Sequence, residues 1–279
     1  MTHHFKRVLK RILPARLWTR LRQIRACYIK RTFRARQVVH TYGGVPLNIY
    51  LADPMSEAWY DYDWPELPEI AFLRQHKLKP GAKVFNLGAH QCVVALMLAK
   101  EVRVEGLVVA VEADAHNAAA GLKNRNLNQA VQLRVIHAAV AEQSGKVVFN
   151  NLNGQMVYDR AGKWGGVELQ AFSIDDLARK YGIPDVLFID VEGYECQALE
   201  GGRETLKHRP DCFVEVHVGA GLEYFGASVE QVLSFFPKPD YDLFVSSPAG
   251  SEFSEFVHLR DDSVQSRFFL LATARKSDL

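Results

Sequence analysis

An apolar run long enough to cross a membrane, about 18 uninterrupted residues, does not occur in this sequence of 279 residues. The basic N-terminus also lacks the apolar core of a secretory signal. The four cysteines (Cys27, Cys92, Cys196 and Cys212) form neither a CxxC pair nor a zinc-like spacing. Free thiols in a reducing compartment are therefore expected, and the sequence predicts a cytoplasmic protein.

Acidic residues are absent from the N-terminal segment. Residues 1–40 contain 12 Lys or Arg and no Asp or Glu, whereas the other 239 residues contain 22 basic and 32 acidic groups. Apolar residues recur at helical spacing from Phe5 to Leu13 and from Leu17 to Tyr28, on either side of Pro14, which breaks or kinks a helix. The sequence therefore predicts a basic amphipathic helical arm over 1–40 and a main domain over 41–279.

Two uses of this arm are open. A basic amphipathic helix with Trp and Phe can associate peripherally with an anionic membrane, here at its inner face. It can also pack on the main domain or on a partner through its apolar side. Nucleic acid binding is not expected, because no recognition motif accompanies the charge.

In the main domain, apolar strand patterns alternate with helical ones. The strand patterns cover 83–87, 106–113, 131–142, 146–149, 167–172, 185–191 and 212–218, and the helical ones 92–102, 116–128, 173–182, 194–209 and 228–236. Continuous Val, Ile, Leu and Phe strands separated by helices indicate a parallel sheet covered on both faces. The last strands, 241–247 and 267–274, have no helix between them and predict an antiparallel edge hairpin. The predicted fold class is thus α/β, with a doubly wound, mostly parallel sheet of seven strands.

The remaining segments are predicted to be less regular. Residues 41–52 indicate a short hairpin or strand, 53–70 irregular structure, 71–77 a short helix, and 150–166 a loop or hairpin. Aromatic residues in these segments could stack on the face of a sugar, or simply pack. They are Trp59, Tyr60, Tyr62, Trp64 and Trp164.

A dinucleotide-binding fingerprint is also missing. The first strand ends in Asn86-Leu87-Gly88-Ala89-His90, with one glycine where GxGxxG needs three, so an enzyme that binds NAD or a nucleotide-sugar is disfavoured. Gly88 still permits a tight turn and close backbone approach. Glu112 ends the second strand, a position suited to accept hydrogen bonds from a ribose diol. The alternative is a solvated charge at a strand end, but the spacing of 26 residues from Asn86 favours ribose binding.

Carboxylates gather where two later strands end. Asp190, Glu192 and Glu195 fall within six residues after an apolar strand, and such groups repel unless a cation, a hydrogen bond or a metal holds them. Helix capping explains one of them at most. Glu215 and His217 lie two apart in the next strand and share a face. His217 is either a general base or a structural histidine.

These residues, in order, resemble the FkbM-type S-adenosylmethionine-dependent methyltransferases over roughly 68–247. The resemblance is carried by the NLGAH and VEAD strand ends, AAVAE, SGKVVF, SIDDL, and above all IDVEGYE with the downstream VEVH. It implies a class I methyltransferase sheet, S-adenosylmethionine as methyl donor, and O-methylation of a sugar, glycan or glycosylated small molecule.

The resemblance also implies roles for single residues. It places the methionine part of the cofactor at the first loop, the ribose at Glu112, and the adenine edge after the third strand. The implied cofactor-binding residues are Asn86, Gly88, Ala89, His90, Glu112, Ala113, Ala139, Val140 and Asp190, and the implied catalytic residues are Asp190, Glu192, Glu195 and His217.

A divalent metal is a further option for the same carboxylates. If Asp190, Glu215 and His217 bound such a cation, it would orient the acceptor hydroxyl and lower its pKa. Without a metal, a carboxylate or histidine at the hydroxyl suffices, because the cofactor already carries the activated leaving group. The sequence leaves both options open.

The first loop departs from the family pattern Asp-x-Gly-Ala-Asn-x-Gly at Asn86, His90 and Cys92, and Phe188 stands where a lysine is common. Asn86 lacks the charge that attracts an ammonium, so weaker cofactor binding is expected. Cys92 adds a side chain that could crowd the start of the helix. A second hypothesis follows: a non-catalytic methyltransferase-fold scaffold, docked to a membrane or partner by the basic arm.

Overall fold

The computed structural model describes residues 32–152, 155–158, 167–246, 253–260 and 266–275. The predicted helices of the basic arm and most of the 150–166 segment, with Trp164, lie outside these ranges. Among the helices described, none has the length and apolarity that crossing a bilayer requires.

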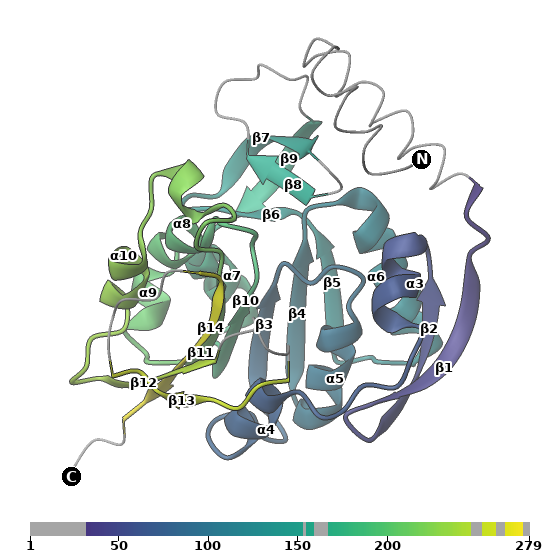
Figure 1. Cartoon of the computed structure of the whole chain (residues 1–279), viewed down its shortest axis with the longest axis horizontal. Coiled ribbons are helices and arrows are strands. Elements are labelled where there is room, and N and C mark those ends of the chain that lie inside the picture. Colours follow the sequence, from purple (N-terminus) through teal and green to yellow (C-terminus); the bar gives the residue numbers. More distant parts are fainter. Residues whose placement is uncertain (1–31, 153–154, 159–166, 247–252, 261–265, 276–279) are drawn as a thin grey trace, which may run out of the picture.

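The central sheet has eight strands, in the order β13-β12-β14-β11-β10-β3-β4-β5 (Figure 1). They are β3 (Lys83–Leu87), β4 (Leu107–Glu112), β5 (Leu133–His137), β10 (Val186–Ile189), β11 (Asp211–Val216), β12 (Tyr241–Ser246), β13 (Val257–His258) and β14 (Phe268–Ala274). Strands β5, β4, β3, β10 and β11 pair in parallel. The mostly parallel sheet is confirmed.

The antiparallel pair expected at the edge of the sheet is confirmed. Strand β14 is antiparallel to β12, its predicted partner, and also to β11, and it lies between the two. The two-residue strand β13 pairs with β12 and brings the strand number from the predicted seven to eight. The sequence order reverses between β3 and β10, which creates the crevice where open α/β sheets bind ligands.

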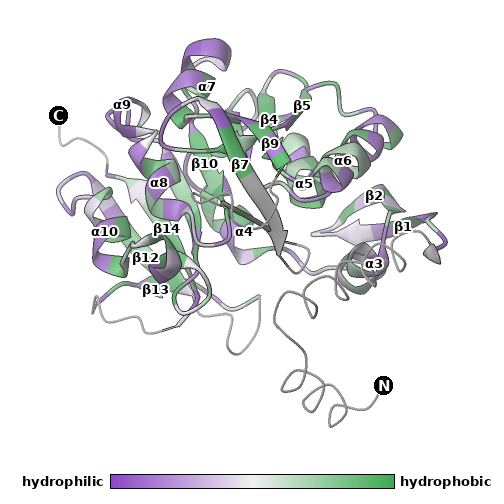
Figure 2. Ribbon diagram, turned by 90° about the horizontal axis from the view of Figure 1, so that it is seen from above, coloured by the Kyte–Doolittle hydropathy of each residue, from purple (hydrophilic) through white to green (hydrophobic). Residues whose placement is uncertain are grey.

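Helices cover both faces of the sheet, as a doubly wound fold requires. On one face lie α4 (Pro68–Arg74), α5 (Val93–Val102) and α6 (Ala115–Leu127); on the other lie α7 (Ile174–Tyr181), α8 (Glu195–Glu200), α9 (Arg203–Leu206), the 3₁₀ helix η1 (Leu222–Phe225) and α10 (Val229–Ser234). Alternate residues of a strand pack into two separate hydrophobic cores, one on each face of the sheet. Val84 packs on the face covered by α5, and Phe85 packs on the face covered by α7 and α8. Strand β10 is hydrophobic throughout, whereas α7 is largely hydrophilic (Figure 2).

An N-terminal hairpin packs beside α6. It consists of β1 (Arg36–Tyr42) and β2 (Val45–Leu51). The hairpin expected at 41–52 therefore begins at residue 36, within the segment 1–40 that was predicted to be the basic arm. Two side-chain amides take the place of a neighbouring strand. Asn124 Oδ1 in α6 accepts from Tyr50 N at 2.7 Å, and Oδ1 of Asn128, the C-cap of α6, accepts from Asn48 N at 2.9 Å. These bonds satisfy part of the open edge of β2.

The prediction of irregular structure over 53–70 is wrong at 54–60 and 68–70, which are helical, and holds for 61–67 between them. Helix α3 (Pro54–Tyr60) begins there, and α4 starts at Pro68, ahead of the predicted residue 71. The Asp53 side chain accepts from the backbone N of Met55 and Ser56, and Ser56 Oγ accepts in return from Asp53 N. This capping box, followed by proline in the first helical turn, starts a helix within an aromatic and acidic stretch.

Two other elements differ from their predictions. The strand expected over 131–142 divides into β5 and β6 (Ala139–Val140), and β6 joins a second sheet with β9 (Val167–Phe172), β7 (Gly145–Leu152) and β8 (Gln155–Tyr158). The helix expected over 194–209 divides into α8 and α9 at Gly201 and Gly202. A Cβ on Gly201 would stand 2.4 Å from the Ala141 carbonyl oxygen, so the chain must pass this point without a side chain.

Candidate functional site

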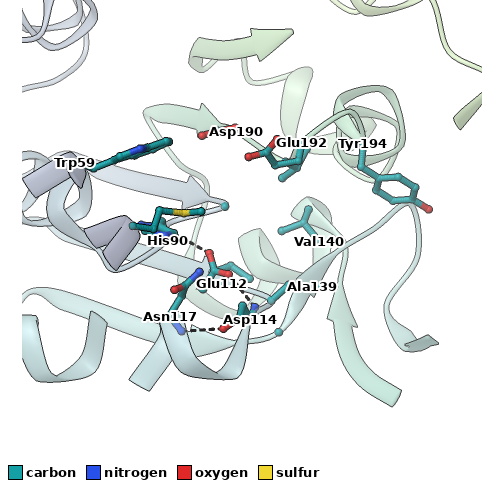
Figure 3. A pocket seen from close by; sticks show the side chains of 16 residues that line it. Trp59, His90, Glu112, Asp114, Asn117, Ala139, Val140, Asp190, Glu192 and Tyr194 are labelled. Carbon is teal, nitrogen blue, oxygen red and sulfur yellow. Dashed lines mark hydrogen bonds between the residues drawn. The ribbon is translucent and has the colours of Figure 1, made fainter. Parts of the chain in front are cut away.

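A cavity of about 390 Å³ lies at the carboxyl ends of β3, β4 and β10 (Figure 3). Eight residues that the sequence predicted line it: Gly88, His90, Glu112, Ala113, Ala139, Val140, Asp190 and Glu192. Further lining residues, not predicted as cofactor-binding or catalytic, include Met55, Trp59, Asp114, Asn117 and Tyr194. The predicted residues Asn86, Ala89, Glu195 and His217 stand behind this wall rather than in it.

The turn after β3 brings three strand ends together. The backbone N atoms of Gly88 and Ala89 both donate to the carbonyl oxygen of Val111, at 2.9 and 3.0 Å. Gly88 has φ +85°, and a Cβ at this position would stand 1.6 Å from the Asp190 carbonyl oxygen. Only glycine fits here, because the turn packs directly on the backbone that carries Asp190.

Glu112 is buried at the end of β4 and faces the cavity. Its Oε2 accepts from His90 N at 2.7 Å and its Oε1 from Asp114 N at 2.8 Å. Burial raises the pKa of this carboxyl to about 7, although the backbone hydrogen bonds oppose the rise. Asp114 in turn caps α6 by accepting from His116 N and Asn117 N. An Asp directly before a helical pattern is a sequence signal for the cap, whereas Asn117 has no such signal.

His90 connects the turn to α3. Its Nδ1 lies 2.7 Å from the Tyr60 hydroxyl oxygen, and its ring centroid lies 5.9 Å from that of Trp59. Burial raises the pKa of Tyr60 well above its usual value, so the phenol stays protonated. The histidine that replaces the family's asparagine therefore holds an aromatic wall beside the cavity.

Asn86 and Cys92, the other two departures in this loop, lie beneath the cavity. Asn86 is buried in β3, and its Oδ1 has no hydrogen-bond partner among the described residues. The Cys92 side chain is accommodated because residue 121 of α6 is glycine: a Cβ there would stand 2.5 Å from Cys92 Sγ. The backbone at Cys92 is left-handed, with φ +64°, which costs a non-glycine residue roughly 1–3 kcal/mol.

The carboxylates after β10 surround one histidine. His217 Nδ1 lies 2.8 Å from Glu195 Oε1. Its Nε2 lies 3.3 Å from both Glu192 and Glu215, and 3.7 Å from Asp190. Asp190 and Glu192 face the cavity, while Glu195 is fully buried behind them. The structure therefore brings the predicted catalytic residues together, with His217 at their centre.

The cation of His217 offsets part of the negative charge in this cluster. Burial lowers the pKa of His217, but hydrogen bonds to Glu195 and Glu215 and the charge of Asp190 outweigh it and hold the pKa at about 11. His217 is therefore an imidazolium at neutral pH, which favours a role as counter-ion over the hypothesis of a general base. Burial and the nearby Glu215 raise the pKa of Asp190 well above its usual value.

Close backbone packing fixes Glu192 beside His217. A Cβ on Gly193 would stand 2.5 Å from the carbonyl carbon of Gly221, so the loop after β10 and the loop after β11 touch through their backbones. Gly193 N also donates to Glu195 Oε1 at 2.8 Å. Because Gly193 and Gly221 carry no side chains, the backbones of these two loops can come into direct contact.

Three side chains of this cluster are close enough to one another to hold a metal ion. Asp190, Glu192 and His217 offer ligand atoms within 4.8 Å of one another. The set differs from the predicted one, because Glu215 pairs instead with Arg267 Nε at 2.8 Å. A metal bound through His217 would have to take the place of the imidazolium proton, so no step is assigned to one.

Comparison with known proteins supports the family that the sequence motifs predicted. The family model of the methyltransferase FkbM domain matches residues 86–243. No curated protein sequence matches the chain.

Solved structures similar to this chain include three methyltransferase-fold proteins. The FkbM methyltransferase from Methylobacillus flagellatus has 19% identity and a TM-score of 0.44, over 68% of this chain and 43% of that one. The Bacillus cereus O-methyltransferase, in complex with S-adenosylhomocysteine, has 14% identity and a TM-score of 0.44 over 74% and 80%. The Aeropyrum pernix fibrillarin, with natively bound S-adenosylmethionine, has 11% identity and a TM-score of 0.43 over 88% and 86%. The chain thus spans less than half the length of the first of these.

Proposed function

This chain belongs to the FkbM family of S-adenosylmethionine-dependent methyltransferases, and we propose that it methylates a hydroxyl oxygen of a sugar, a glycan or a glycosylated small molecule. One observation supports this proposal most. The carboxyl groups of Glu112 and Asp190 face the same cavity from two strand ends, with the Gly88 turn between them. One acid suits a ribose diol, and the other suits an acceptor hydroxyl.

The residues of the cavity fit the proposed cofactor. Its volume of about 390 Å³ falls in the range of small-molecule sites, about 300–1,000 Å³. Glu112 is buried with both oxygens oriented by backbone N–H groups, as a ribose acceptor must be. Ala139 and Val140 provide an apolar edge for adenine. We therefore assign the ribose to Glu112 and the methionine part to the Gly88–His90 turn.

Bound S-adenosylmethionine supplies a methyl group that is already activated by the sulfonium. The chain then has to orient the acceptor oxygen and remove one proton. Asp190 is suited to that transfer by its position, because its carboxyl group faces the cavity in which the acceptor hydroxyl would lie. The imidazolium of His217, 3.7 Å away, orients Asp190 and keeps the neighbouring carboxylates from repelling one another.

Calorimetric titration with S-adenosylmethionine and S-adenosylhomocysteine tests the cofactor. Binding is expected, and no heat at millimolar ligand would exclude the enzyme. Asp190→Asn should abolish methyl transfer in a panel of saccharide acceptors while cofactor binding persists. Asp242→Asn is the matched control, since Asp242 is remote from the cavity and pairs with Arg275. Unchanged turnover in Asp190→Asn would remove Asp190 from its role.

The second candidate is a non-catalytic scaffold with the methyltransferase fold. It is favoured by the neutral Asn86, whose buried Oδ1 has no partner among the described residues. A chain that binds neither cofactor nor product would be of this kind. The basic arm would then provide docking to a membrane or partner.

A further inference from the structure

Asp53 is a buried carboxylate that contacts three separate segments. It lies between β2 and α3 and is 4% exposed. Its Oδ1 accepts from Met55 N at 2.9 Å and from Ser56 N at 2.8 Å. Its Oδ2 accepts from Gln91 Nε2 at 3.0 Å and lies 2.8 Å from His116 Nε2. An ordinary helix cap needs only the first oxygen, so the contacts of Oδ2 require another explanation.

Both partners of Oδ2 belong to the cofactor side of the cavity. Gln91 directly follows His90 in the turn after β3 and is fully buried. Its Nε2 also lies 3.3 Å from the Oδ1 of Asn117, which lines the cavity. His116 stands in the first turn of α6, next to the cap Asp114. Oδ2 thus contacts both the turn after β3 and the start of α6, the two segments that position Glu112 and its neighbours.

Helix α3 forms the opposite wall of the cavity. Met55 and Trp59 line it while remaining 42% and 53% exposed, as residues that meet an acceptor at a cavity mouth would be. The helix has seven residues, too few to be stable without tertiary contacts. Its position therefore depends on the contacts that attach it, and Asp53 provides them at its N-terminus.

We infer that Asp53 is a positioning residue that ties the α3 wall, through Gln91 and His116, to the cofactor side of the cavity. Met55 and Trp59 are then held at a fixed distance from the turn that receives the methyl donor. Such a link is reciprocal: a ligand on the cofactor side steadies the acceptor wall, and an acceptor strengthens cofactor binding. The inference rests on the proposed function for the identity of the two ligands, but not for the link itself.

The variant Asp53→Asn tests the contacts of Oδ2 with Gln91 and His116 without removing the cap of α3. Asparagine caps a helix as well as aspartate does, so Oδ1 keeps its role. The amide that replaces Oδ2 cannot accept from Gln91 Nε2. Gln91→Met is the second variant, because it leaves the cap untouched and removes the same bond from the other side. Asp242→Asn again serves as the matched control.

The NMR signal of Trp59 reports the position of α3 at the cavity. The full-length chain, labelled with 5-fluorotryptophan, gives a ¹⁹F resonance for Trp59 that Trp59→Phe identifies by its loss. In the ligand-free protein, this resonance should broaden or move in Asp53→Asn and in Gln91→Met, and stay in place in Asp242→Asn. S-adenosylhomocysteine should move it in the unaltered chain and move it at least twofold less in the two variants.

The kinetic pattern separates positioning from general loss of structure. In Asp53→Asn, KM for the acceptor should rise about tenfold, whereas Kd for S-adenosylhomocysteine should change less than threefold. An unchanged Trp59 resonance in both variants would overturn the inference, as would an equal loss of both affinities. If the unaltered chain binds no S-adenosylhomocysteine, the proposed function fails, but the ligand-free resonance still tests Asp53.

Discussion

The carbonyl oxygen of Asp190 occupies the place where residue 88 would carry a side chain: a Cβ on Gly88 would stand 1.6 Å from it. The turn that is proposed to receive the methyl donor and the residue proposed to accept the proton are thus in direct backbone contact. A change in either one is transmitted to the other without an intervening side chain.

Gly88→Ala should therefore disrupt the site and the fold together. The methyl group would overlap backbone atoms that cannot move independently, and the residue would also have to keep φ +85°. We expect a loss of roughly 3–5 kcal/mol in the free energy of unfolding, measured by urea or thermal denaturation. Gly44→Ala is the control, because Gly44 has φ +79° with no atom within 4 Å of the added Cβ. It should cost roughly 1 kcal/mol, and equal losses would show that contact with Asp190 is unimportant.

Cofactor binding should depend on pH through Glu112. The ribose hydroxyls need an ionised acceptor, and burial raises the pKa of this carboxyl to about 7. As the pH falls through 7, the acid takes up a proton and binding weakens, by up to about tenfold for each unit of pH below the pKa. Calorimetric Kd values for S-adenosylhomocysteine between pH 5.5 and 8.5 would show this.

Glu112→Gln separates this titration from that of the other acids near the cavity. The variant should bind more weakly at pH 8, and its Kd should hardly vary with pH over the same range. A slope that persists in Glu112→Gln would assign the pH dependence to another group.

Much of this site is readable from the sequence because its parts follow a simple rule. Apolar runs that end in an acid, such as those before Glu112 and Asp190, indicate buried parallel strands, and parallel strands end at one edge of the sheet. The family motif identified the same positions. The strand ends could therefore be brought together without coordinates.

The remaining features depend on contacts between distant residues. Asp53 meets Gln91 and His116 across 38 and 63 residues of sequence. The aromatic stretch after it offered Trp59 as a possible contact for a sugar, but not the contacts that attach α3 to the cavity. The insertion of β14 between β11 and β12 is likewise a choice between pairings that local sequence does not distinguish. The charge state of His217 follows from four acids whose distances only the fold defines.

Asn86→Asp should strengthen binding of S-adenosylmethionine. Asn86 lies beneath the turn with its Oδ1 unpaired among the described residues, so a carboxylate there would attract the cofactor's ammonium group through space. We expect a Kd about threefold lower, equivalent to roughly 0.7 kcal/mol. The gain should be absent for 5′-methylthioadenosine, which lacks the ammonium. An equal gain for both ligands would contradict an electrostatic cause.

His217→Gln should destabilise the chain by removing the cation at the centre of the cluster. Glu195 is fully buried and would lose its charged partner, and breaking such a pair costs roughly 3–5 kcal/mol. The loss should be larger at pH 6 than at pH 10, because the pKa of His217 is raised to about 11: its stabilising contribution is complete below the usual histidine pKa and declines as the pH approaches 11. Denaturation at the two pH values measures this.

The cation of His217 also predicts independence from metals. Because it already places a positive charge beside Asp190 and Glu192, a chelator should leave methyl transfer unchanged. Addition of Mg²⁺ or Mn²⁺ to the chelated protein should also have no effect. Restoration of activity by either ion after chelation would show that the three ligand atoms hold a metal instead.

The basic arm is proposed to associate with an anionic membrane. Four cations near its start, Lys6, Arg7, Lys10 and Arg11, share a segment without acids, and each contributes about 1 kcal/mol near an anionic surface. Replacing all four by glutamine in the full-length chain should reduce co-sedimentation with phosphatidylserine vesicles at least tenfold. Binding of the unaltered chain should weaken as the salt concentration rises.

A control with the same change in net charge decides whether the arm is responsible. Lys79, Lys100, Arg103 and Lys238 are exposed on the main domain, and their replacement by glutamine should leave vesicle binding within about twofold of the unaltered chain. Equal losses in the two variants would mean that net charge, not the arm, drives binding. If neither the unaltered chain nor the variants sediment with vesicles, the arm does not dock on anionic membranes, and its apolar side is left to pack on a partner or on the main domain.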